Sequence, residues 1–288
     1  MTRKEKKEKV NEIIDLVISD LQMNEVQASP IRLSDIDYMR DEVYDTSKVK
    51  CIAFRNKGDK YELENGSIIE LNLGNMISNP TEVGGVWFKN SECAYISSIY
   101  SSNSIDCIDI QRTLSNHTNG LKAKRVYRNL TNEHSVFQRV DFDFFNIEFM
   151  KFVILSKIRS NEDFRNLLLS IPDNVMLIED VSFLKGSKKL VWGAENIELK
   201  RIKKEKLKLL KQRLLEDNIQ FSKRYTQMLN NKIHSIGCYC GKNIMGKILT
   251  EAVIRMKHYT DEPEIIVDYN LLDSKNIYWF GEKLNFLK

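Results

Sequence analysis

The chain has 288 residues, of which 42% are hydrophobic and 29% are charged, so it can bury a sizeable core in one large or elaborated domain. No stretch approaches the roughly 18 apolar residues of a membrane-spanning helix, and we therefore expect no membrane partner. The net charge of +4 is uneven, because residues 197–232 hold eleven basic and four acidic residues, a net of +7, which leaves the remainder near −3.

The cysteines and the N-terminal segment predict a reduced, cytoplasmic protein. The first ten residues are charged and lack the apolar core of a secretory signal. The spacing of the cysteines fits no disulfide framework, and the five are Cys51, Cys93, Cys107, Cys238 and Cys240. His234 lies near two of them in sequence, but structural zinc needs four ligands in familiar pairs and no second pair is present, so no metal is predicted.

An amphipathic helix and a polar connector are predicted at the start of the chain. Residues 5–22 place apolar side chains at helical spacing, namely Val10, Ile13, Ile14, Val17 and Leu21. A polar stretch follows to about residue 48 and is predicted to be a connector. We expect an N-terminal helical extension over residues 1–45 and one main domain over residues 46–288.

Two strands and a capped helix are predicted next. Residues 49–54 and 67–73 are short apolar runs bounded by turn-rich segments, which is typical of strands. Residues 81–100 begin extended and then form a helix, for which Asn90 or Ser91 can act as the cap.

The middle of the chain predicts two helices followed by a buried strand. The helices are expected at residues 144–158 and 161–171, and Pro172 ends the second one. The strand is expected at residues 175–181.

The last third of the chain predicts more helix and two terminal strands. One long charged helix is expected from residue 197 to about 230, with an apolar stripe at roughly heptad spacing. The stripe consists of Leu207, Leu210, Leu214, Phe221, Tyr225 and Met228. Another helix is predicted at residues 244–256, and strands are predicted at 264–270 and 276–281.

Residues 73–93 (LGNMISNPTEVGGVWFKNSEC) carry an ordered pattern of Asn, Pro, Gly, an aromatic residue and Ser-Glu. The pattern residues are Asn75, Pro80, Gly85, Phe88, Ser91 and Glu92, with Phe54-Arg55 upstream. This segment resembles the opening motif of the NADAR family, which comprises YbiA-like N-glycosidases and ADP-ribose-related hydrolases.

Three further segments resemble later parts of the same family, in the family's order. They are AKRVYR at residues 123–128, the stretch from Phe149 to Trp192-Gly193, and GKNIMGKIL at residues 241–249. The resemblance covers roughly residues 50–256. It implies a helix-rich α+β fold with short strands, into which this chain inserts its long basic helix and to which it adds terminal extensions. It also implies an N-glycosidase acting on an ADP-ribosylated base or a related ribosyl nucleotide, with no cofactor.

The resemblance implies that Glu92, Lys124 and Trp192 carry catalysis. Breaking a ribosyl N-glycosidic bond builds positive charge at the anomeric carbon, which the Glu92 carboxylate could stabilise while an acid assists the departing base. Trp192 could stack on the base, and Lys124 could attack an opened ribose as an amine. The structural alternatives are a helix first turn for Glu92, a core position for Trp192 and a solvated face for Lys124.

The same resemblance implies a set of ligand-binding residues. Guanidinium groups bind phosphate oxygens, and backbone N–H groups at the start of a helix can cradle a phosphate. The predicted ligand-binding residues are Phe54, Arg55, Asn75, Phe88, Arg125, Arg128, Lys242 and Asn243. The alternatives are a solvated basic face for the arginines and a helix cap for Asn243. We expect Glu92, Arg125, Trp192 and Asn243 to line one pocket.

The sequence departs from the family pattern at several positions, including Ile96 and Ile99 where the family has Gln and Lys. The family's His after the glutamate is Cys93, the Gly of its Gly-Arg pair is Tyr127, and the Asp before its Trp-Gly is Lys189. These changes leave two alternatives to a hydrolase. One is an ADP-ribose- or nucleotide-binding module without catalysis, and the other is an interaction protein that uses the long helix, including with itself as a homo-oligomer. The basic segment 197–232 also predicts a nucleic-acid partner, because phosphate contacts give affinity without sequence reading.

Overall fold

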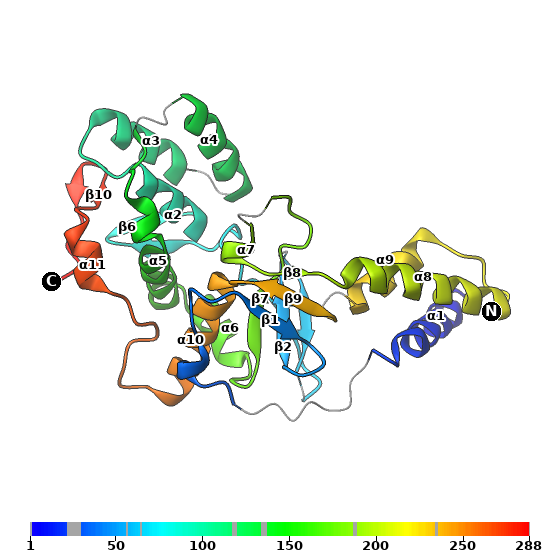
Figure 1. Ribbon diagram of the computed structural model, residues 1–288. Helices are drawn as coiled ribbons and strands as arrows, with labels where there is room; N and C mark the ends of the chain where they lie inside the picture. The colour runs from blue at the N-terminus through cyan, green and yellow to red at the C-terminus, as the bar shows by residue number, and fades with distance from the viewer. Residues whose placement is uncertain are drawn as a thin grey trace. The chain divides into compact units, whose positions relative to one another are not determined.

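The computed structural model describes residues 2–21, 30–55, 57–63, 65–116, 120–133, 137–186, 189–233 and 236–287. The chain is a helix-rich α+β protein with short strands, as the sequence predicts (Figure 1). It divides into two compact units, of which unit 1 combines residues 1–53 with 174–247 and unit 2 combines residues 54–173 with 248–288. No helix within the described ranges is both long enough and apolar enough to cross a membrane.

Unit 1 contains a three-stranded antiparallel sheet and a separate strand pair. Its strands are β1 (Glu42–Asp45), β2 (Cys51–Phe54), β7 (Met176–Glu179), β8 (Glu195–Asn196) and β9 (Cys238–Gly241). The sheet has the order β1-β9-β8, and β2 pairs with β7. In the sheet, Tyr239 of β9 lies opposite Tyr44 of β1 on one side and Asn196 of β8 on the other. The strands predicted at 49–54 and 175–181 are thus confirmed.

The polar connector predicted up to residue 48 is wrong in part, because β1 lies within it together with the short helix η1 (Leu33–Asp35). β1 has only four residues, two of which are acidic, so its sequence is too short and too polar to predict a strand. The strand is held from elsewhere in the chain. The buried Lys247 ammonium lies 3.2 Å from the Glu42 carboxylate and donates to the Arg40 carbonyl oxygen at 3.0 Å.

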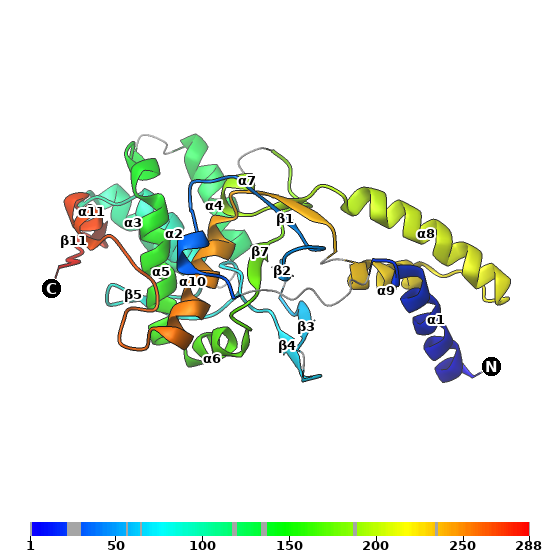
Figure 2. The same ribbon diagram turned by 60° about the horizontal axis from the view of Figure 1, so that its bottom comes forward.

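Unit 1 also contains a helical bundle, which we define as α1 (Arg3–Ile18), α8 (Leu199–Glu216) and α9 (Lys223–Ile233). The three helices lie side by side in both views (Figures 1 and 2). Their common core is made of Val10, Ile13, Ile14, Val17, Ile18, Ile202, Leu210, Leu214, Ile219, Leu229 and Ile233. The amphipathic helix predicted at the N-terminus is confirmed, and ion pairs from Lys206 to Asp20 and from Lys232 to Asp15 add to the packing.

The single long helix predicted from 197 to about 230 is wrong, because α8 ends at Glu216 and α9 begins at Lys223. Asn218 adopts a left-handed conformation with φ of 55°, which Asn tolerates better than most residues and which stops a right-handed helix. The Ile219 N–H then donates to the Leu214 carbonyl oxygen at 2.7 Å and folds the chain back. Leu210 and Leu214 of the predicted stripe are buried in the bundle, while Phe221 is 38% exposed.

Unit 2 is built mainly from helices, and the two predicted in the middle of the chain are confirmed as α5 and α6. The helices are α2 (Ser91–Ile99), α3 (Ile105–Ser115), α4 (Gly120–Glu133), η3 (Phe142–Phe144), α5 (Asn146–Ser160), α6 (Glu162–Ser170) and α11 (Tyr269–Ser274). The helix predicted at 244–256 is confirmed as α10 (Ile244–His258), whose first four residues, 244–247, belong to unit 1. A short helix of unit 1, α7 (Lys189–Trp192), completes the set.

Three small hairpins complete unit 2. They are β3 (Lys60–Glu62) with β4 (Ile68–Glu70), β5 (Thr81–Val83) with β6 (Val86–Phe88), and β10 (Tyr278–Trp279) with β11 (Glu282–Lys283). The strands predicted at 67–73 and 276–281 are confirmed as β4 and β10.

The strand predicted at residues 264–270 is wrong. The side chains alternate as in a strand, with Ile265 buried and Ile266 exposed at 45%. However, the Ile266 N–H donates to the Glu251 carboxylate at 2.9 Å instead of to a neighbouring strand. Asp268 then caps α11, because its carboxylate accepts the Leu271 N–H at 2.8 Å.

Candidate functional site

The N-terminal turn of α2 in unit 2 holds the carboxylate that the sequence singles out. Asn90 caps the helix, its side-chain oxygen accepting the Cys93 N–H at 3.0 Å, as one of the two predicted caps. Glu92 is only 6% exposed, and its backbone N–H donates to the Asn75 carbonyl oxygen at 3.1 Å. The positive end of the helix dipole favours a negative charge at this position. The carboxylate is therefore held in a buried position at the N-terminal end of the helix.

Lys124 of α4 forms an ion pair with Glu92. The ammonium nitrogen lies 3.1 Å from Oε1, and the lysine side chain is 37% exposed while that of Glu92 is 8% exposed. A buried carboxylate is costly unless it is paired, so this contact compensates the desolvation of Glu92. The pair combines an almost fully buried acid with a cation that remains open to solvent.

Gly120, which is not among the residues predicted from the sequence, helps to hold α4 at this distance. The Gly120 N–H donates to the Met76 carbonyl oxygen at 3.3 Å. A Cβ atom at Gly120 would lie 2.5 Å from the Met76 Cα atom, so no other residue fits without moving the backbone. The start of α4 is thereby fixed beside the loop that carries Asn75. A single isolated glycine in one sequence does not predict such a close backbone contact.

Asn75 is a buried residue of this site that orients the start of α2. Its side-chain oxygen accepts a hydrogen bond from the Ser91 hydroxyl at 3.1 Å, and its Nδ2 donates to the Met150 sulfur at 3.3 Å. Both Asn75 and Ser91 are buried. In this structure, Asn75 fixes the backbone that positions Glu92.

Two further side chains of α2 lie next to Glu92 in sequence or on its helix face. Cys93 is fully buried, and burial raises the pKa of its thiol to about 12, so it stays protonated and unreactive. Tyr95 lies three residues after Glu92, on the same side of the helix. Its pKa is raised, first by burial and then by the charges of Glu92 and Asp143. Tyr95 is not among the residues predicted from the sequence, although its spacing from Glu92 is a signal that could have identified it.

The remaining predicted residues of unit 2 differ in exposure. Arg125 and Arg128 are exposed on α4, and Arg128 follows Lys124 by one helical turn. Arg55 is half-buried, and its backbone N–H donates to the Asp59 carboxylate at 2.9 Å. Phe54 and Phe88 are each 1% exposed. The Phe88 ring meets the Trp279 ring edge to face at 4.7 Å, so it is a core residue in this structure.

The predicted residues of unit 1 lie where α10 meets β7. The Asn243 side chain is fully buried, accepting the Glu179 N–H at 3.1 Å and donating to the Leu177 carbonyl oxygen at 2.8 Å. A Cβ atom at Gly246 would lie 2.1 Å from that same Leu177 oxygen. The Gly-x-Asn-x-x-Gly pattern thus joins the start of a helix to a strand. The Asn243 side chain uses both its oxygen and its nitrogen in that joint.

Lys242 directly precedes Asn243 in the chain, and the backbone that follows Trp192 contacts the same joint, because the Ala194 N–H donates to the Glu179 carbonyl oxygen at 2.9 Å. Trp192 is half-buried at the end of α7, and a Cβ atom on the following Gly193 would lie 2.5 Å from the Glu179 carbonyl oxygen. The half-buried Lys242 uses its backbone N–H to bond the Leu190 carbonyl oxygen at 2.8 Å. Glu92, Lys124 and Arg125 thus belong to unit 2, while Trp192, Lys242 and Asn243 belong to unit 1. Their common pocket stays a prediction from the sequence.

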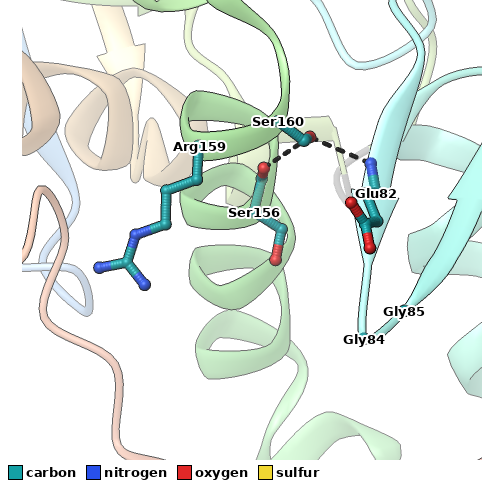
Figure 3. Close-up of a pocket in the computed structure, with 6 residues that line it drawn as sticks. All are labelled: Glu82, Gly84, Gly85, Ser156, Arg159 and Ser160. Carbon is teal, nitrogen blue, oxygen red and sulfur yellow. Dashed lines mark hydrogen bonds between the residues drawn. The ribbon is translucent and has the colours of Figure 1, made fainter.

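A small pocket lies elsewhere in unit 2, between the β5–β6 turn and α5 (Figure 3). It has a volume of about 230 Å³ and is lined by Glu82, Gly84, Gly85, Ser156, Arg159 and Ser160. The Glu82 N–H closes one side by donating to the Ser160 hydroxyl at 3.0 Å. Ligand pockets usually measure about 300–1,000 Å³, and none of the predicted site residues lines this one. It is too small for a nucleotide.

Within the part of the chain that the structure describes, no group of three or more His, Cys, Asp or Glu residues could hold a metal ion. Cys238 and Cys240 lie in β9, and the pKa of Cys238 is raised, first by burial. His234, the third residue considered for zinc, lies outside the described residues.

Comparisons with known proteins find similarity to solved structures. No protein-family model matches the chain, and no curated protein is similar to it in sequence at a significant level. Among solved structures, the chain is similar to the solution NMR structure of the E. coli protein YbiA, with 15% sequence identity and a TM-score of 0.35. The match covers 60% of this chain and 92% of that protein.

Proposed function

We propose that this chain hydrolyses the N-glycosidic bond of a ribosyl nucleotide, such as an ADP-ribosylated base, with Glu92 and Lys124 as the reacting pair. The observation that carries the proposal is the contact between an almost buried carboxylate and a half-exposed ammonium group at 3.1 Å. The motifs that resemble the NADAR family supply the type of substrate.

The two groups suit the charges that this reaction develops. As the bond between the anomeric carbon and the base nitrogen breaks, its electron pair moves to the base and positive charge develops on the sugar. The Glu92 carboxylate stabilises that charge and accepts a proton from the attacking water. The Lys124 ammonium gives its proton to the departing base, and a proton passing from Glu92 to Lys124 restores the pair. The exposed arginines Arg125 and Arg128 would hold phosphate oxygens.

A purely structural role is the competing explanation of the pair, since an ion pair between α2 and α4 also holds two helices together. A glutamate that serves only the helix dipole can remain exposed, as Glu162 does in the first turn of α6. Glu92 is instead buried and reached by a lysine from another helix. A buried charge with a specific charged partner is typical of catalytic sites, although structural ion-pair networks also contain such pairs.

The test is base release from a panel of ADP-ribosyl nucleosides, NAD-derived nucleotides and ribosylamino-pyrimidines, followed by mass spectrometry. We expect the wild type to release the base from at least one compound, and Glu92→Gln to lower the rate by about 100- to 1,000-fold. Glu162→Gln is the matched control, because it makes the same change in the first turn of another helix. Equal rates in wild type and Glu92→Gln, or no release from any compound, would reject the proposal.

A ligand-binding module without catalysis is the second candidate, and Cys93 favours it. The family pattern has a His at this position, whereas the buried Cys93 thiol with its pKa of about 12 cannot exchange protons near neutral pH. Binding without turnover would appear as thermal stabilisation of the protein by a panel compound that stays intact.

A further inference from the structure

One side of α8, on the outside of the helical bundle, carries four exposed lysines. The four residues are Lys200, Lys204, Lys208 and Lys211, and all four are exposed. Their spacing of four, four and three residues places them on one side of a helix, because each residue turns the helix by about 100°. The buried residues Ile202, Leu210 and Leu214 lie on the other side, against α1 and α9. We call the four residues the lysine face.

The acidic residues of α8 do not neutralise the lysine face. Glu205 pairs with Arg201 at 3.2 Å, and Glu216 pairs with Arg213 at 3.3 Å. Within the described residues, no carboxylate is paired with any of the four lysines. Lys211 also lies 5.0 Å from the centre of the Phe221 ring. The lysine face therefore keeps its positive charge, while the arginines and glutamates compensate one another along a neighbouring strip.

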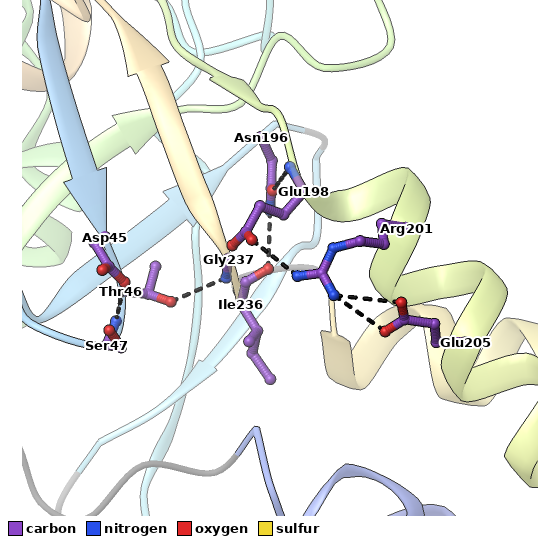
Figure 4. A network of polar contacts seen from close by, with 9 residues as sticks. All are labelled: Asp45, Thr46, Ser47, Asn196, Glu198, Arg201, Glu205, Ile236 and Gly237. Carbon is purple, nitrogen blue, oxygen red and sulfur yellow. Dashed lines mark hydrogen bonds and ion pairs between the residues drawn. The ribbon is translucent and has the colours of Figure 1, made fainter.

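The start of α8 is held firmly to the sheet of unit 1 (Figure 4). Glu198 pairs with Arg201 at 2.9 Å, and its backbone N–H donates to the Asn196 side-chain oxygen at 3.2 Å. Asn196 also donates through Nδ2 to the Ile236 carbonyl oxygen at 2.9 Å, which joins the chain entering α8 to the chain leaving α9. The lysines are thus carried on a fixed helix, which limits the entropy lost when an anionic partner binds.

We propose that the lysine face binds the phosphate backbone of a double-stranded nucleic acid without reading its sequence. The face is about 17 Å long at a rise of about 1.5 Å per residue, and one strand of a duplex presents about five phosphates over that length. Lysine ammonium groups are point charges that match phosphates but carry no base-reading geometry. An anionic membrane is disfavoured, because the apolar side of α8 is covered by α1 and α9 and cannot enter lipid.

The test measures binding of the full chain to a labelled DNA duplex of about 20 base pairs and to an RNA duplex of the same sequence. Fluorescence anisotropy is recorded between about 50 and 200 mM salt. If each lysine neutralises one phosphate, the logarithm of the binding constant falls against the logarithm of salt with a slope of about −3 to −4. Binding of either duplex with this slope supports the proposal, and the tighter one identifies the preferred backbone.

The variants separate the lysine face from overall charge. Lys→Gln at all four positions lowers the net charge from +4 to 0, and we expect it to weaken binding at least 10-fold and to flatten the salt slope. The matched control makes the same four-charge change at exposed lysines elsewhere, at Lys57, Lys60, Lys185 and Lys283. It should bind like the wild type. Lys→Arg at the four face positions keeps the charge and should also bind.

Several results would overturn the proposal. One is that the wild type binds neither duplex at the lowest salt. Another is that the control loses as much affinity as the lysine-face variant, which would make the effect one of net charge alone. A third is tighter binding to phosphatidylserine vesicles than to either duplex. Circular dichroism of each variant verifies that all of them are folded.

Discussion

Lys157 of α5 predicts an unusual dependence of stability on pH. The side chain is fully buried, and its ammonium nitrogen lies 4.0 Å from the centre of the Phe164 ring. Among the described residues, this nitrogen has no hydrogen-bond partner. Burial lowers the pKa of Lys157 from 10.5 to about 7. The folded chain therefore holds this amine at a position that disfavours its charged form.

The difference between the two pKa values sets the size of the effect. It is about 3.5 pH units, and each unit corresponds to about 1.4 kcal/mol, so the charged form destabilises the fold by up to about 5 kcal/mol. Between pH 7 and 10.5 the unfolded chain holds the proton and the folded chain does not. The free energy of unfolding therefore rises with pH across this window, by at most about 1.4 kcal/mol per unit. Below the folded pKa the full penalty remains.

The perturbation is Lys157→Met, which keeps an unbranched side chain and removes the charge. We expect the free energy of unfolding at pH 7 to increase by about 2–4 kcal/mol, since the lost contact with the Phe164 ring offsets part of the gain. By about pH 9.5 the advantage over the wild type should fall to about 1 kcal/mol. Denaturant unfolding followed by circular dichroism at several pH values between these limits measures both effects.

Lys151→Met is the control for Lys157, because it makes the same change on the same helix. The Lys151 ammonium is also nearly buried but lies 2.8 Å from the Glu148 carboxylate. Removing it leaves a half-buried carboxylate without this cation, so this variant should lose stability at pH 7. A Lys157→Met variant that is less stable than the wild type at pH 7, or whose stability rises with pH as steeply as that of the wild type, would refute this role of Lys157.

Two further predictions concern the Asn243 joint and the Cys93 thiol. Asn243→Ala leaves the Glu179 N–H and the Leu177 carbonyl oxygen without their partner, so denaturant unfolding should show that the free energy of unfolding falls by about 2–4 kcal/mol. A fall of less than about 0.5 kcal/mol would show that these hydrogen bonds do not stabilise the fold. Cys93, with its pKa near 12 and no exposure, should remain unmodified by iodoacetamide in the folded protein at pH 8 and react only after unfolding. Mass spectrometry of the peptides reports this, and rapid labelling of the folded protein would show that the thiol is accessible.

Local signals explain which elements were predictable. α2 was found because Asn90 and the apolar residues after it lie within one segment of sequence, as do the apolar residues of α1. The strand wrongly predicted at 264–270 has the right alternation, but no strand among the described residues pairs with it. Its Ile266 N–H is satisfied by Glu251, which is distant in sequence. Pairing partners of this kind cannot be deduced from a pattern in one segment.

In the candidate site too, the sequence predicts which residues matter but not which of them are in contact. The sequence identified Glu92 and Lys124 separately, through the motifs that contain them. Their pairing depends on Gly120, whose missing side chain lets α4 approach the backbone at Met76. The sequence also marked Asn243 as either a ligand-binding residue or a helix cap. The structure uses its amide to hold β7, a role that requires knowing which strand lies beside α10.

The antiparallel pairing of β8 with β9 has a topological consequence for the segment between them. Asn196 lies opposite Tyr239 in that ladder, and its side chain reaches the Ile236 carbonyl oxygen. The segment that contains α8 and α9 therefore connects two paired antiparallel strands, as the loop of a β-hairpin does. Excising the loop and closing the hairpin with a tight turn would leave the sheet register unchanged while stripping α1 of its packing surface. The N-terminal helix and the α8–α9 segment thus depend on each other, because each buries the apolar side chains of the other.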